Sequence, residues 1–143
     1  ASCLLAPLVG RQAGLLLADT ARYAEKQLFV AQCGVDPARI AAIGGIEARG
    51  VDLWAERERV LDLLTEAGKN LLAVGRVQVL LLGCLSFLGL AHPLSERLGV
   101  PVVDPAVAPV ALAECLVRQG LKTSRKAYPA PPLRKRTWQS GQL

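Results

Sequence analysis

Short runs of apolar residues alternate along the chain with segments in which apolar and polar positions mix. Three runs are continuous rather than alternating, which is typical of strands buried on both faces of a parallel sheet. They are residues 13–18 (AGLLLA), 77–82 (VQVLLL) and 100–104 (VPVVD). A weaker strand is predicted at residues 39–43, ended by Gly44 and Gly45.

The mixed segments have the spacing of amphipathic helices. The clearest is residues 54–73, where one apolar stripe faces away from the charges and Trp54 is expected in the core at the helix entry. The stripe consists of Val60, Leu63, Leu64, Ala67 and Leu71. Three further helices are predicted from their capping residues: from Asp19/Thr20 to about Cys33, from Pro93 to Leu98, and from Asp104/Pro105 to about Gln119.

The alternation of strands and helices predicts an α/β fold, in which parallel strands are covered by helices on both sides. In such sheets ligands bind beyond the carboxyl ends of the strands. Three places in the chain occupy such ends: Asp19/Thr20, Gly83–Cys84 and Asp104. These are the candidate functional positions.

Length and composition suit one domain with a core, since the chain has 143 residues and 52% of them are hydrophobic. The chain has no methionine and begins Ala-Ser-Cys, so we expect a piece of a longer protein. Its longest apolar run, from Val79 to Ala91, is 13 residues, shorter than the roughly 20 of a membrane span. The four cysteines show no C-x-x-C spacing, which argues against a zinc site or a disulfide framework and predicts a reducing cytoplasm.

The net charge of +5 is a property of the carboxyl-terminal end. From Cys115 onward there are seven basic residues and no acidic one, whereas the preceding part holds 10 basic and 12 acidic residues. We therefore divide the chain into an α/β lobe, residues 1–119, and a basic, proline-containing segment, residues 120–143, with YPAPP (128–132) extended. A solvated basic end is more common than a nucleic-acid site, so no nucleic-acid partner is predicted.

Cys84 is the residue on which a functional interpretation depends. A free cysteine in an apolar setting is often a small core residue. The alternative is a thiol that exchanges a carbon-bound proton, since Cys84 follows a strand and a turn leading toward a helix favours the thiolate. Gly83 would let the backbone approach a ligand, and the amides of Leu85, Ser86 and Phe87 would face an anion.

A long stretch beginning VLLLGCLSFLG resembles a known family. The features are a strand ending LGC (82–84), then LGVPVVDP (98–105), then LAECLVRQGLKTS (112–124), a Tyr-Pro segment and a basic stretch. Together they resemble the carboxyl-terminal part of the hydantoin/allantoin racemases of the aspartate/glutamate racemase superfamily. The resemblance implies a Rossmann-like parallel-sheet lobe of a two-lobe fold, with the amino-terminal lobe largely missing and the active site between the lobes.

The resemblance also implies a cofactor-independent isomerase with no metal, acting on a small hydantoin-type molecule. One cysteine on each lobe works on opposite faces of the substrate. Cys84 matches the second cysteine, and the first would lie upstream of residue 1. The other cysteines, Cys3, Cys33 and Cys115, are interpreted as structural.

Substrate-binding positions follow from the same resemblance and from the strand ends. They are Gly83, Leu85, Ser86, Thr20, Lys122 and Thr123. We expect a homo-oligomer or pairing with the missing lobe. Apolar surface should then be exposed around Cys84 and on the final helix.

Two departures from the family pattern leave alternatives open. The family usually has GCAGM where this chain has GCLSF (83–87), and a Thr-rich turn where this chain has Ala18 and Asp19. One alternative is a single-cysteine decarboxylase of the same superfamily, in which one thiol protonates an enediolate. Another is an inactive truncated homologue that acts as a binding or packing module.

Overall fold

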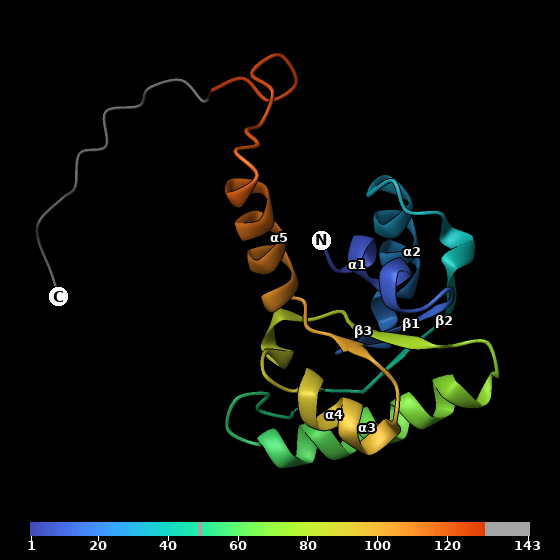
Figure 1. Cartoon of the computed structure of the whole chain (residues 1–143). Coiled ribbons are helices and arrows are strands. Elements are labelled where there is room, and N and C mark those ends of the chain that lie inside the picture. Colours follow the sequence, from blue (N-terminus) through green and yellow to red (C-terminus); the bar gives the residue numbers. More distant parts are fainter. Residues whose placement is uncertain (49, 131–143) are drawn as a thin grey trace, which may run out of the picture.

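A four-stranded parallel sheet organises the molecule (Figure 1). The computed structural model describes residues 1–48 and 50–130. The strands are β1 (Ala13–Leu17), β2 (Ile40–Gly45), β3 (Val79–Leu82) and β4 (Val102–Val103), arranged β2-β1-β3-β4. All three pairings are parallel, which confirms the predicted α/β class.

The two central strands are buried on both faces because helices cover both. All residues of β1 and β3 are buried. Successive side chains of a strand point to opposite faces. Leu16, Leu80 and Leu82 accordingly belong to one hydrophobic cluster, and Leu15 and Leu81 to the other.

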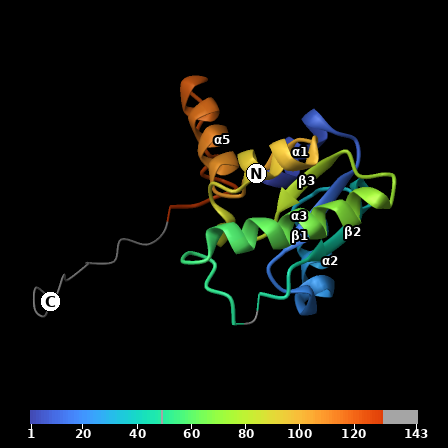
Figure 2. The ribbon, with the colours of Figure 1, turned by 90° about the horizontal axis from the view of Figure 1, so that it is seen from below.

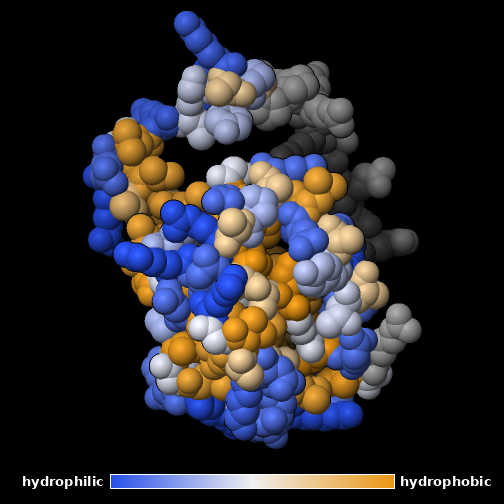
Figure 3. Space-filling model, turned by 90° about the vertical axis from the view of Figure 1, so that its right-hand side faces the viewer, coloured by the Kyte–Doolittle hydropathy of each residue, from blue (hydrophilic) through white to orange (hydrophobic). Residues whose placement is uncertain are grey.

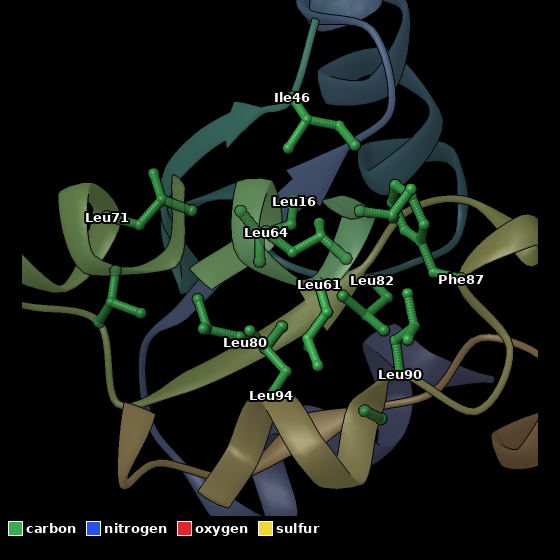
Figure 4. Close-up of a cluster of buried hydrophobic side chains, with 13 residues drawn as sticks. Leu16, Ile46, Leu61, Leu64, Leu71, Leu80, Leu82, Phe87, Leu90 and Leu94 are labelled. Carbon is green, nitrogen blue, oxygen red and sulfur yellow. The ribbon is translucent and has the colours of Figure 1, made fainter. Parts of the chain in front are cut away.

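On one face lie α3 (Arg57–Ala73) and α4 (Ala91–Leu98), which form the larger cluster with the sheet (Figures 2 and 4). Figure 4 shows side chains of α3 and α4 pointing toward those of β1 and β3. The predicted stripe of α3 is largely confirmed: Val60, Leu64 and Leu71 are buried, whereas Leu63 and Ala67 are partly buried.

On the other face lie α1 (Ser2–Val9) and α2 (Tyr23–Gln32), and α5 (Val107–Arg118) rises away from the sheet (Figure 1). Three short 3₁₀ turns complete the order: η1 (Thr20–Arg22), η2 (Pro37–Arg39) and η3 (Leu85–Phe87). Asp19 caps the 3₁₀ turn η1, whereas the helix predicted from Asp19/Thr20 begins only at Tyr23.

The prediction that Trp54 lies in the core at the helix entry is wrong. Its side chain is 60% exposed and it lies outside the helix. The carboxylate of Asp52 accepts hydrogen bonds from the Trp54 and Ala55 amides, both at 2.9 Å, and closes a turn there. These bonds, that of Ala55 first, lower the pKa of Asp52. The helix therefore begins only at Arg57.

Other boundaries differ by a few residues. β2 continues through Gly44 and Gly45, α4 begins two residues before Pro93, and α5 begins at Val107 because residues 105 and 106 form a turn. β4 has two residues rather than five. The helix α1 was not predicted, since Pro7 and the nearly uniform apolar sequence around it show no helical periodicity.

The carboxyl-terminal segment is described only in part. Residues 119–130 contain no helix or strand. Residues 131 and 132 of the YPAPP stretch and the basic residues Arg134, Lys135 and Arg136 lie outside the described residues. The division at residues 119/120 stays a prediction. Among the helices of the described part, none has both the length and the apolar character that crossing a membrane requires.

Candidate active site

The carboxyl ends of β1 and β3 meet at the point where the strand order reverses. From β1 the chain moves outward to β2, and from β3 it moves outward to β4. Such a switch point is where open α/β sheets bind ligands. Asp19/Thr20 follow β1 and Gly83–Cys84 follow β3, so two of the three predicted places adjoin this point.

Close packing against β1 explains why a glycine stands at position 83. Its amide donates a 2.7 Å hydrogen bond to the carbonyl of Leu16 on β1. A Cβ at Gly83 would lie 3.0 Å from that oxygen and 2.7 Å from a methyl carbon of Leu17. The close approach that glycine permits here is therefore to β1, and contact of Gly83 with a substrate stays a prediction.

Cys84 is half-buried and begins the turn after β3. Its backbone is extended and its carbonyl accepts a 3.1 Å hydrogen bond from the Phe87 amide. In the part of the chain that the structure describes, the amides of Leu85 and Ser86 donate to no acceptor. The anion-facing set predicted from the sequence is corrected to these two amides, because Phe87 is already engaged.

The turn after Cys84 is a single 3₁₀ turn, and the next α-helix, α4, begins only at Ala91. Leu85 is 65% exposed and Ser86 is half-buried. The surface beside the thiol thus combines an apolar side chain with polar backbone. A helix macrodipole contributes little at such a short turn.

Thr20 lies at the neighbouring strand end, exposed, and its hydroxyl donates to the carboxylate of Glu47. Glu47 follows the carboxyl end of β2, so the ends of β1 and β2 are tied together by this bond. The carboxylate of Asp19 accepts from the Ala21 amide at 2.9 Å. Glu47 was not among the predicted site residues, although the strand-end rule that identified Thr20 applies to it as well.

Asp104 is buried and acts as a junction. Its carboxylate accepts hydrogen bonds from the amides of Gly89 at 2.9 Å, Ala106 at 2.8 Å and Val107 at 3.2 Å. The sequence predicts Asp104 as the cap of a helix opened by Pro105, whereas the carboxylate caps the turn of residues 105 and 106 that precedes α5. The bond to Gly89 adds a link from α5 back to the segment that follows Cys84.

Lys122 and Thr123 follow the end of α5 and are exposed. Within the described residues, no hydrogen bond joins them to the Cys84 turn, and their place in a site stays a prediction. Cys3 is half-buried in α1, while Cys33 and Cys115 are exposed, so the latter two are not core residues. Burial, followed by the nearby Cys33 thiol, raises the pKa of Cys3.

Within residues 1–48 and 50–130, the side chains that could bind a metal ion do not cluster. No three His, Cys, Asp or Glu side chains gather there as a metal site requires. On the surface of α4, Nδ1 of His92 lies 3.5 Å from Oε2 of Glu96.

The predicted apolar surface is present around Cys84 and on α5. Leu85 and Leu88 are exposed beside the thiol. On and after α5 the exposed apolar residues are Val107, Val110, Leu116, Val117 and Leu121. A groove of about 720 Å³ lies between α1, α4, β4 and α5, and its lining includes Leu8, Val102 and Ala108.

Sequence comparison finds two curated relatives of the chain. A hydantoin racemase of Paenarthrobacter aurescens is 38% identical over 84 residues, which are 57% of this chain and 36% of that protein. A hydantoin racemase of Pseudomonas sp. (strain NS671) is 37% identical over 82 residues, which are 57% of this chain and 33% of that protein. The similar segment thus spans about a third of each relative. No family model matches the chain.

Two solved structures share the fold. The allantoin racemase of Pseudomonas fluorescens superposes with a TM-score of 0.77 at 24% identity, over 96% of this chain and 58% of that one. The allantoin racemase of Klebsiella pneumoniae gives a TM-score of 0.80 at 22% identity, over 96% and 56%. The fold and the resemblance to hydantoin/allantoin racemases are confirmed, for a part of the relatives' length.

Proposed function

We propose that the chain is part of a cofactor-independent isomerase that racemises 5-substituted hydantoins or allantoin, with Cys84 as an acid/base thiol. The observation that carries the proposal is the position of Cys84 at the sheet's switch point, at the carboxyl end of β3. The similarity to hydantoin racemases supports the substrate class. A thiol of this kind has to stay reduced, which suits a cytoplasmic location.

The chemistry suits a thiol because the C5 proton of a hydantoin lies beside a carbonyl group. Removal of that proton by the Cys84 thiolate gives an enolate, whose negative charge spreads onto the carbonyl oxygen. The amides of Leu85 and Ser86 are the donors available to stabilise that oxygen. Thr20, Lys122 and Thr123 are proposed to hold the polar edge of the substrate.

Inversion needs a second group on the opposite face of the substrate, since one base returns the proton to the side from which it came. Among the four cysteines, Cys84 alone lies at the carboxyl end of a strand. We therefore place the second thiol on a partner, either an amino-terminal lobe of the same fold or a second copy. The exposed apolar surface of α5 supports such pairing.

The test follows an enantiopure 5-substituted hydantoin in D2O by optical rotation and by the C5–H proton signal. Above the spontaneous exchange of a protein-free blank, loss of both signals would mean complete racemisation. Loss of C5–H with rotation retained would mean a half-site with one working thiol. Cys84→Ser should abolish either activity, and Cys115→Ser, which removes an exposed thiol of α5, should not. A folded chain without exchange would contradict the proposal for this chain alone and favour a binding or packing module.

A second candidate is decarboxylation by one thiol, favoured by the same single strand-end cysteine. Loss of CO₂ from a disubstituted malonate gives an enediolate, which Cys84 would protonate on one face. The reaction would release CO₂ and leave one enantiomer of the product in excess. Racemic product, or no CO₂ above the blank, would exclude this candidate.

A further inference from the structure

Arg57, the first residue of α3, reaches the backbone of the segment that carries Cys84. Its Nη1 donates a 2.7 Å hydrogen bond to the carbonyl of Ser86, and its Nη2 donates to the carbonyl of Leu88. Nη1 also donates to the carbonyl of Leu53 at 3.3 Å, and the guanidinium carbon lies 5.2 Å from the centre of the Trp54 ring. These contacts hold the half-buried side chain in one place.

A cation is unfavourable at this end of a helix. The first turn carries the positive end of the helix macrodipole and prefers acidic side chains, such as Glu58 one residue later. The helix itself therefore gives no reason for an arginine here. A residue that breaks a local preference is explained by its tertiary contacts, and those of Arg57 are with the turn after Cys84.

The two carbonyls belong to peptides that are each held at their other side as well. The Ser86–Phe87 peptide accepts from Arg57 and donates through its N–H to the carbonyl of Cys84. The Leu88–Gly89 peptide accepts from Arg57 and donates to the carboxylate of Asp104. A chain of hydrogen bonds thus runs from α3 to Cys84, and a second one runs to the start of α5.

We propose that Arg57 is a positioning residue for Cys84. It fixes the two peptides so that the thiol and the amides of Leu85 and Ser86 keep one relative geometry. Its consequence for catalysis rests on the proposed function, whereas its effect on the turn does not. A fixed donor geometry is what stabilises developing charge in a transition state.

The experiment compares Arg57→Ala with Arg59→Ala in the full chain. Arg59 lies in the same turn of the helix, is exposed, and pairs with Glu56. Two measurements are made at fixed pH: exchange of the hydrogen-bonded amides of residues 87–90, and peptide-resolved alkylation of each cysteine by iodoacetamide. For Arg57→Ala we expect exchange of this segment and alkylation of Cys84 to rise about tenfold, as loss of a charge-assisted hydrogen bond implies. Arg59→Ala should change neither.

Arg57→Lys gives the rescue test. An ammonium group reaches one carbonyl but cannot bridge two as the guanidinium fork does, so intermediate values are expected. If Arg57→Ala unfolds the chain, which equal acceleration of alkylation at the half-buried Cys3 would reveal, Arg57→Lys decides. Exchange and Cys84 alkylation at wild-type rates in whichever variant is folded would overturn the proposal.

Catalysis supplies an independent readout. Where the wild type exchanges C5–H, Arg57→Ala should lower kcat about tenfold and leave KM within about twofold, because transition-state geometry is lost and not binding. A wild type without C5–H exchange would count against the proposed function. The turn measurements would still decide the role of Arg57.

Discussion

The helices α3 and α5 both carry an apolar face, but only the apolar face of α3 is covered by the rest of the chain. Val60, Leu64 and Leu71 of α3 are buried against the sheet. Val107, Val110 and Val117 of α5 also share one helical face, yet each is more than half exposed. Hydrophobic periodicity predicts that a helix has an apolar face, but not that the same chain covers it.

The space-filling view agrees with this contrast. In Figure 3 the lower edge of the molecule, where α3 lies, is largely hydrophilic, and hydrophobic side chains are exposed higher on the same face. The outward face of α3 carries charged residues, some of them in the ion pairs Lys69–Glu66 and Arg97–Asp62. The outward surface of α3 is thus largely charged, whereas α5 exposes apolar side chains.

The largest expected effect tests the contrast directly with one truncation on each helix. Leu64→Ala should lower the free energy of unfolding by about 2–5 kcal/mol, because it leaves a cavity in the core. Val117→Ala, at a position 74% exposed, should change it by less than about 0.5 kcal/mol. Urea unfolding followed by circular dichroism measures both. Similar losses in the two variants would mean that α5 is packed in solution.

Asp104 joins α5 to the rest of the fold, and its removal should have the next largest effect. Asp104→Ala removes the acceptor of three backbone amides, and a lost cap of this kind costs about 1–2 kcal/mol. Hydrogen exchange should rise first at Gly89 and in the first turn of α5. The control is Asp36→Ala, which removes one exposed cap bond to Ala38. A larger loss from the control would contradict the junction role.

Association is the third test, and it concerns assembly more than stability. If the exposed apolar face of α5 binds a second copy, the isolated chain should self-associate. Val117→Asp should then shift the chain toward monomer in sedimentation equilibrium. Asn70→Asp adds the same charge on the exposed face of α3 and should leave association unchanged. A wild-type chain that is monomeric at all concentrations would remove the interface interpretation of α5.

The elements were predictable where local pattern and tertiary packing agree. Continuous apolar runs gave β1 and β3 because both faces of those strands are covered. Trp54 was misplaced because Asp52 closes a turn before the helix begins, and α1 was missed because its sequence has no polar side to mark a face. The hydrophobic pattern shows neither the side-chain cap at Asp52 nor the packing of α1 against the sheet, and these contacts determine where the two helices form.

The site shows the same division. The positions of Cys84 and Thr20 after the ends of β3 and β1 could be predicted from the sequence, since strand ends follow from the strand pattern. Arg57 could not, because its partners Ser86 and Leu88 lie some thirty residues away along the chain, at separations of 29 and 31. Basic residues stand in the first turn of α3 at both Arg57 and Arg59, so the sequence signal neither singles out Arg57 nor reveals which carbonyls it meets.

The smallest expected effect concerns the alkylation rates of the thiols of α1 and α5. Cys3 of α1 is half-buried and its pKa is raised, because burial and the nearby Cys33 disfavour its thiolate. Only the thiolate reacts with iodoacetamide, so Cys3 should reach its full alkylation rate at a higher pH in the folded chain than in urea. For the same reason the folded chain should lose a little stability as the pH rises above about 8.5, where the unfolded chain begins to form the thiolate. Exposed Cys115 should react faster than Cys3 at every pH. Equal profiles for Cys3 with and without urea would mean that α1, like α5, is not held against the sheet in solution.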